Sequence, residues 1–197
     1  ATDQNGATNQ DRTNYFQTVP KNALDTALWL ESDRMGHFKG SITQAKLDEQ
    51  RGVVQNEKRQ GDNEPYGKVF EMILKQLFPP DHPYSWEAIG SMEDLNAASL
   101  DDVRHWFETW YGPNNAVIVI AGDVDSDEAF AKAEKYFGDI APGPAATRLE
   151  EWIPIHAQPR RQQMQDRVAQ ARLYMAWTGP RWGTRDAHQL ELAAAVL

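Results

Sequence analysis

Glu57 is the residue whose position in the sequence most directly suggests chemistry. It belongs to a helical pattern whose members recur every three or four residues, namely Leu47, Gln50, Val54 and Glu57. We therefore expect Glu57 to project from the same helix face as Leu47 and Val54, toward the core. A buried carboxylate needs a cation or several hydrogen-bond donors, because an unpaired ion in the interior is costly.

The residues alone leave two interpretations of Glu57 open. In the first, it is a metal ligand on an inward-facing helix surface. In the second, the helix rotates slightly at Gly52 and leaves Glu57 solvated beside Lys58 and Arg59. Gln50 likewise reads either as a polar group that orients a metal site or as a partly buried helix residue.

Histidine and cysteine, the usual nitrogen and sulfur ligands, do not form a recognisable metal motif in this chain. There is no cysteine, and none of the five histidines lies within helical reach of another. We interpret all five as ordinary surface or loop residues: His37, His82, His105, His156 and His188. The acidic run from Asp123 to Glu128 lacks the glycine and distal glutamate of a calcium loop, and we expect it to begin a helix.

Several short motifs occur in an order and spacing that resemble the pitrilysin and insulinase family of zinc metallopeptidases. They are Asn5-Gly6-Ala7-Thr8 with Asp11, Thr13 and Tyr15; the run from Leu47 to Glu57; His82-Pro83-Tyr84; Ile89-Gly90; Tyr111-Gly112-Pro113-Asn114-Asn115; and Ile120-Ala121-Gly122-Asp123. No single motif is decisive, but together they occur in register over more than a hundred residues. The resemblance is to bacterial members of the family and implies an envelope or periplasmic location, although the sequence leaves the compartment open.

The resemblance implies a zinc site to which this chain contributes one ligand. In that family an inverted His-x-x-Glu-His helix supplies two histidine ligands and a general base, and a glutamate on a later helix supplies the third ligand. Glu57 matches that glutamate, and zinc is the cofactor expected in the full-length parent. Many members carry a second glutamate seven positions earlier, where this chain has Gln50.

His-x-x-Glu-His does not occur in these 197 residues. The family places that motif upstream of the segment that matches the start of this chain. We therefore expect an internal fragment that is inactive alone and holds zinc weakly, from a parent that hydrolyses peptides through a zinc-bound water. The alternative is a non-catalytic structural or partner subunit of the same fold.

The resemblance also implies a substrate-binding strand at Asn5, Gly6, Ala7 and Thr8, which correspond to the family's Asn-Ala-x-Thr segment. An extended peptide would add to this edge as another strand, and Tyr15 would lie at the end of the same strand region. Gly6 stands where alanine is usual, and glycine weakens a strand. Taken without the resemblance, the segment reads as a polar turn.

Composition restricts the partners. Lys and Arg total 20 against 29 Asp and Glu, giving a net charge of -9 without a basic stripe, so nucleic acid is not expected. No apolar run reaches the roughly 20 residues that span a bilayer. The expected partners are peptide or unfolded polypeptide substrates and the remaining domains of the parent chain.

Periodicity and capping residues predict the elements that would position these groups. Helices are expected at 23–35, from a Ser41/Gln44 capping box to about Arg59, from Pro65 to Pro79, at 99–110 after Ser99, from Asp125 or Ser126 to Gly138, and at 190–197. Strands are expected at Arg12–Val19, Ala116–Ala121 and Arg167–Trp177, and a linker at Ala141–Thr147.

These elements predict an α+β fold with an antiparallel or mixed sheet covered by helices. Together with the resemblance, they indicate a pitrilysin-like half-domain truncated at both ends. Residues 1–147 would form the C-terminal part of the metal-bearing peptidase domain, and residues 148–197 a linker and the start of a second, related domain.

Overall fold

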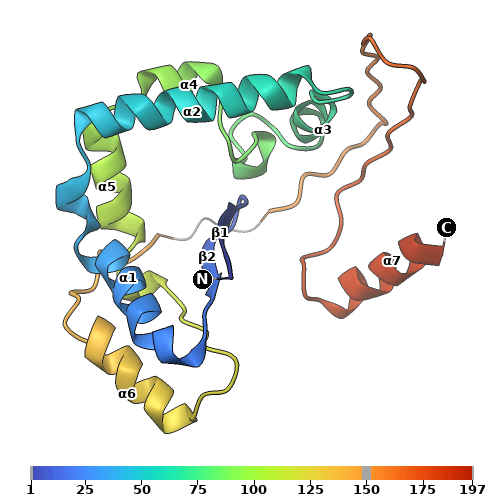
Figure 1. Ribbon diagram of the computed structural model, residues 1–197. Helices are drawn as coiled ribbons and strands as arrows, with labels where there is room; N and C mark the ends of the chain where they lie inside the picture. Colours follow the sequence, from blue (N-terminus) through green and yellow to red (C-terminus); the bar gives the residue numbers. More distant parts are fainter. Residues whose placement is uncertain (1, 148–151, 197) are drawn as a thin grey trace. The chain divides into compact units, whose positions relative to one another are not determined.

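The computed structural model describes residues 2–147 and 152–196, which form two compact units (Figure 1). Within the described residues, the first unit comprises 2–57 and 88–147, and the second comprises 58–87 and 152–196. Helices predominate, and an antiparallel strand pair makes the chain α+β, as predicted. The predicted domain boundary at 148 and the end of the last helical pattern at Leu197 lie outside the described residues.

The first unit begins with a hairpin of β1 (Asp3–Thr8) and β2 (Thr13–Thr18), paired antiparallel. The turn is closed by Asn9, whose side-chain Oδ1 accepts hydrogen bonds from the backbone N–H groups of Asp11 and Arg12 at 2.9 and 3.0 Å. An asparagine that bonds the backbone two and three residues ahead is a common turn-former. The predicted strand at Arg12–Val19 is confirmed, and Asn5–Thr8 lies in a strand. The prediction that Tyr15 ends the same strand region is wrong, because the turn at Asn9 places Tyr15 on β2, opposite Gly6.

The helices of the first unit include two that begin at their predicted caps and one, at 92–97, that was not predicted. They are α1 (Leu24–Gly36), α4 (Met92–Ala97), α5 (Leu100–Trp110) and α6 (Ser126–Phe137), with short 3-10 turns at Lys21–Ala23, Phe38–Ser41 and Pro113–Asn115. Ser99 and Asp102 form a capping box at α5, and Asp125 caps α6. Ala27 and Leu28 of α1 are buried, as is Phe137 of α6, and the two helices pack together (Figure 1).

Helix α2 (Gln44–Asn63) is longer than predicted and begins at a different cap. The Ser41 hydroxyl donates to the Phe38 carbonyl, and Ser41 ends the preceding 3-10 turn before α2 begins, so it does not cap α2. Thr43 occupies that position: its carbonyl accepts from the N–H of Leu47 at 3.0 Å, and its hydroxyl lies 3.4 Å from the N–H of Lys46. Gly52 does not interrupt the helix.

The second unit contains the end of α2, α3 (Val69–Leu77), a 3-10 turn at Pro83–Ser85 and α7 (Arg185–Val196). The prediction that Pro65 begins the third helix is wrong, because Tyr66 adopts a φ of 65°, which lies outside the helical region. The helix starts at Val69, and its apolar stripe buries Val69 and Leu74.

Two predicted strands are absent from the described residues. Residues 116–121 and 167–177 have no regular structure, and Val117 and Leu173 are 89% and 83% exposed. A strand is defined by hydrogen bonds to a neighbouring strand, and within residues 2–147 and 152–196 only β1 and β2 provide such bonds for each other. The apolar residues there therefore remain on the surface.

A hydrogen-bonded carboxylate joins α1 to α6. Asp25 accepts bonds from the Lys132 ammonium and, at 2.7 Å, from the Tyr136 hydroxyl. The hydrogen bond from Lys132, then that from Tyr136, lowers the pKa of Asp25 from 3.8 to about 2. Because the unfolded carboxyl binds a proton near 3.8, the stabilisation is complete above that pH and is lost as the pH falls through about 2.

We predict that Asp25→Asn lowers the urea midpoint of unfolding at neutral pH and flattens its decline in acid. The measurement is urea unfolding followed by circular dichroism over a pH series. Asp139→Asn, which removes an exposed carboxylate just after α6, is the control and should keep the wild-type profile. An Asp25→Asn chain with the same acid dependence as the wild type would show that this contact contributes nothing.

Candidate substrate edge and metal ligand

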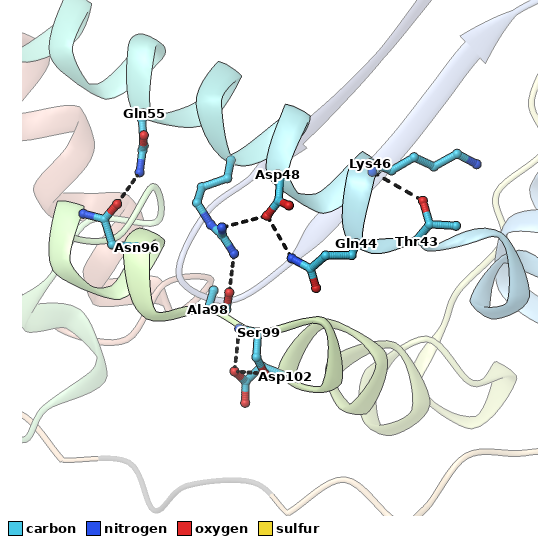
Figure 2. Close-up of polar contacts among 10 residues, drawn as sticks. Thr43, Gln44, Lys46, Asp48, Gln55, Asn96, Ala98, Ser99 and Asp102 are labelled. Carbon is cyan, nitrogen blue, oxygen red and sulfur yellow. Dashed lines mark hydrogen bonds and ion pairs between the residues drawn. The ribbon is translucent and has the colours of Figure 1, made fainter.

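The rotation of α2 about its axis is fixed by two side chains, of which one contacts the α4–α5 connection and the other contacts α4. The Arg51 guanidinium donates to the carbonyl of Ala98 at 2.5 Å and to the carboxylate of Asp48 at 2.9 Å. One turn later, the side chains of Gln55 and Asn96 point toward one another and are joined at 2.8 Å (Figure 2). The face carrying Arg51 and Gln55 is therefore the packed face in this part of α2.

Glu57 lies on the opposite side of the helix. It follows Gln55 by two residues, which turns it by about 200° around the axis. Gln50 precedes Glu57 by seven residues, close to two full turns, so the two share a face. Glu57, Gln50 and the intervening Val53 are all exposed, Val53 by 53%.

The prediction that Glu57 points into the core with Leu47 and Val54 is therefore wrong. Leu47 and Val54 are only partly buried, and Glu57 is on the surface. The physical reason is that Arg51 and Gln55 form the helix contact through polar groups, which the apolar pattern does not reveal. An exposed carboxylate in this position has its oxygens open to a cation.

The described residues do not make a complete metal site. Within residues 2–147 and 152–196, no group of three or more His, Cys, Asp or Glu side chains is placed to hold an ion. Zinc in proteins is generally bound by three or four such ligands. Glu57 is therefore a single exposed carboxylate that the described part of the chain does not group with further metal ligands.

His82 differs from the surface histidine predicted by the sequence. It is buried, with 6% of its surface exposed, in the second unit. Its Nδ1 accepts from the backbone N–H of Tyr84 at 3.0 Å, so Nε2 carries the proton and donates to the carbonyl of Trp152 at 3.2 Å. Both ring nitrogens are used within the fold, which gives the His82-Pro83-Tyr84 motif a structural role.

The remaining histidines also have plain surroundings. His156 is partly buried, and its Nε2 is 2.7 Å from the carbonyl oxygen of Leu77. His37, His105 and His188 are exposed, as predicted.

The free edge of β1 presents alternate backbone groups. The N–H of Asn9 donates to the carbonyl of Arg12 at 2.9 Å, which makes this pair hydrogen-bonded. Pairs alternate along an antiparallel ladder, so Ala7 with Asn14 and Asn5 with Phe16 are also bonded pairs. The backbone groups of Gln4, Gly6 and Thr8 consequently face away from β2. In the two-stranded sheet of the described residues, this edge of β1 has no strand partner.

One backbone amide on that edge, that of Gly6, forms a hydrogen bond with the side chain of the preceding residue. The Gly6 N–H donates to the Asn5 side-chain Oδ1 at 2.8 Å, consistent with an outward-facing Gly6 amide. A strand arriving at this edge would compete with the Asn5 side chain for the Gly6 N–H. Exposed strand edges pair readily with other chains, and a side chain that satisfies an edge amide restrains such pairing.

The Tyr111-Gly112-Pro113-Asn114-Asn115 motif holds the predicted linker in place. Asn114 accepts from the N–H of Gly143 at 2.8 Å and donates to the carbonyl of Pro144 at 3.1 Å. A Cβ on Gly112 would lie 2.4 Å from the Gly143 nitrogen, so only glycine permits this approach. The sequence gave no sign of the contact between this motif and residues 143–144.

The described residues contain no helix that is both long and apolar enough to cross a membrane.

Comparison with known proteins agrees with this architecture. Residues 97–197 match the family described as "Peptidase M16 inactive domain". The chain is 31% identical over 137 residues to zinc protease PqqE of Helicobacter pylori, covering 69% of this chain and 30% of that protein. It is 25% identical over 155 residues to the mitochondrial-processing peptidase subunit beta of Caenorhabditis elegans, covering 79% and 32%.

A solved structure supports the same relationship. The crystal structure of a protease from Helicobacter pylori superposes with a TM-score of 0.66 at 29% identity, covering 77% of this chain and 35% of that one. The chain thus spans about a third of the length of the relatives it matches. Because the family match covers more than half of the residues, the chain belongs to the peptidase M16 family.

Proposed function

We propose that this chain is part of a zinc metalloendopeptidase that hydrolyses peptides or unfolded polypeptide segments. The observation that carries the proposal is the family membership, together with relatives that are named zinc proteases. The exposed position of Glu57 supports its assignment as one zinc ligand, because its carboxylate is free of the α2 packing contacts. Zinc, when bound, would supply a water of lowered pKa for attack on a peptide carbonyl.

In this proposal the chain's own residues bind the peptide substrate and help to hold the metal. Glu57 holds one position of the metal, and Gln50, on the same face of α2, can donate or accept a hydrogen bond near it without adding charge. The β1 edge, in the segment from Asn5 to Thr8, binds an extended peptide through the outward backbone groups of Gly6 and Thr8. The other ligands and the general base would come from a His-x-x-Glu-His segment elsewhere in a longer parent, and residues from 148 onward would lead into a second domain.

A second candidate is a non-catalytic subunit of the same fold. One observation favours it, namely that the matched family description at residues 97–197 reads "inactive domain". In that case the β1 edge and Glu57 would be remnants of a site without metal. A bacterial periplasmic or envelope location is part of either proposal, and the lack of cysteine is compatible with it.

Metal analysis of this chain and of the full-length protein tests the proposal. We expect the 197-residue chain to lose zinc on dialysis and to leave an unstructured peptide intact, because a single carboxylate lacks the nitrogen ligands that give zinc sites their affinity. The full-length protein should retain stoichiometric zinc and show hydrolysis that a chelator abolishes.

The outcomes separate the candidates. Stoichiometric zinc in the isolated chain would mean that it contains further ligands and would contradict the assignment of Glu57 as its single contribution. A full-length protein that neither binds zinc nor hydrolyses peptides would favour the non-catalytic subunit.

A further inference from the structure

Tyr15 lies at the centre of contacts that join the hairpin to two helices of the first unit. Its hydroxyl is 2.7 Å from the hydroxyl of Tyr111, which follows α5. The Arg34 guanidinium of α1 lies 4.0 Å from the centroid of the Tyr15 ring, within cation–π range. Nearby on the same strand, the Gln17 amide donates to Glu31 of α1 at 3.1 Å.

The Tyr15 ring covers the one glycine of the edge strand. Tyr15 and Gly6 are direct cross-strand neighbours, in a pair without mutual hydrogen bonds, where side chains approach most closely. A Cβ built on Gly6 would lie 3.2 Å from Cδ1 of Tyr15. Packing an aromatic ring over a glycine in the facing strand compensates for the missing side chain.

Tyr111 is itself held firmly. Its ring packs on Phe107 with centroids 4.2 Å apart, and Phe107 in turn contacts Phe38 at 5.4 Å. Its backbone N–H donates to the Phe107 carbonyl at 3.0 Å at the end of α5. Burial, then the hydrogen bond with Tyr15, raises the pKa of Tyr111 above its usual range, so the Tyr111 hydroxyl stays protonated near neutral pH.

These contacts restrain the proposed substrate edge, which would otherwise be flexible at Gly6. Glycine loses more conformational freedom than any other residue on becoming extended, and a two-stranded hairpin alone is marginally stable in water. Gly6 lies in the part of β1 whose outward-facing backbone groups must stay aligned for a peptide strand to pair with them. A neighbour with a fixed position limits the motion of Gly6 further, and Tyr15 is held by contacts with Arg34 and Tyr111.

We propose that Tyr111 and Arg34 are positioning residues that hold the Tyr15 ring over Gly6 and so keep the β1 edge extended for an incoming peptide strand. The proposal rests on the function proposed above for the role of the edge. It assigns Tyr111, in the Tyr-Gly-Pro-Asn-Asn motif, a role in substrate affinity that acts through Tyr15.

The first experiment measures amide hydrogen exchange in the 197-residue chain and does not depend on any activity. Tyr111→Phe removes the hydroxyl and keeps the ring. We expect the Asn5 and Ala7 amides, which bond across to β2, to exchange about fivefold faster, the effect of one lost hydrogen bond. Tyr136→Phe is the matched control, because it loses a 2.7 Å hydroxyl bond to Asp25 away from the hairpin and should leave these amides unchanged. Equal exchange in the Tyr111→Phe and wild-type chains would overturn the proposal.

The second experiment measures peptide hydrolysis by the full-length protein. Tyr111→Phe should raise KM for an extended peptide about fivefold with kcat within about twofold, because binding and not chemistry is affected. Adding Gly6→Ala to Tyr111→Phe should restore KM, since the unlocked Tyr15 ring can make room for the methyl group that then restrains the strand. A fall in kcat at constant KM, or no rescue by Gly6→Ala, would contradict a positioning role.

The two experiments distinguish failure of the proposed function from failure of the positioning role. A wild-type full-length protein without peptide hydrolysis would refute the proposed function, and amide exchange would still decide whether Tyr111 positions the edge.

Discussion

Replacing Glu57 with glutamine in the full-length protein is expected to remove most of the bound zinc and nearly all peptide hydrolysis. The amide keeps the size of the side chain but loses the negative charge that faces the cation. Loss of residues that only support a metal ligand already costs about 10–100-fold in affinity or activity, so loss of a ligand should exceed that range. Because Glu57 is exposed and has no part in the α2 packing contacts, the fold should stay intact.

The controls for Glu57 come from the same helix. Glu49→Gln removes an exposed carboxylate on a different face and should leave zinc content and turnover unchanged. Gln50→Ala should reduce activity by about tenfold, the low end of that range, because an amide near the ligand can only orient it. Metal analysis, steady-state kinetics and circular dichroism are the measurements. Wild-type zinc content and turnover in Glu57→Gln would show that the ligand assignment is wrong.

Proline substitutions in β1 are expected to produce the second large effect. They should raise KM for extended peptides by more than about tenfold, because proline lacks a backbone N–H to pair with a neighbouring strand and disturbs the alignment of β1. The register makes two positions differ in mechanism. The Thr8 N–H faces the free edge, so Thr8→Pro removes a donor offered to the peptide while keeping the pairing with β2. The Ala7 N–H faces Asn14, so Ala7→Pro breaks the hairpin itself.

Thr8→Ala is the matched control for Thr8→Pro. Both lose the contact between the Thr8 and Thr13 hydroxyls, which lie 3.1 Å apart, but alanine keeps the backbone donor. The alanine variant should therefore bind peptides nearly as the wild type does. Full-length Thr8→Pro and Ala7→Pro enzymes with unchanged KM and turnover would rule out strand addition at this edge.

Elements set by local interactions could be read from the sequence. The side chains of Ser99 and Asp125 each accept bonds from backbone groups two or three residues ahead, so the residues that start these helices lie next to the helices in the sequence. Ser41 shows the limit of this approach. Its hydroxyl had a nearer local partner in the Phe38 carbonyl, and the cap moved to Thr43.

Local sequence could not show whether residues 116–121 and 167–177 form strands. Their apolar residues fit a buried strand, but pairing depends on a second segment that is distant in sequence. β2 formed as predicted because its partner, β1, lies one tight turn away.

The sequence by itself determined the family, the positions of most helices, the hairpin strand β2, and the residues worth testing. Only the tertiary structure decided which way the side chains of these residues face. Arg51 bonds to a carbonyl 47 residues away and turns Glu57 outward, and Tyr15 meets a hydroxyl 96 residues away that fixes it over Gly6. Helix periodicity reports which residues share a face, but contacts between distant segments choose which face is packed and which remains open to a ligand.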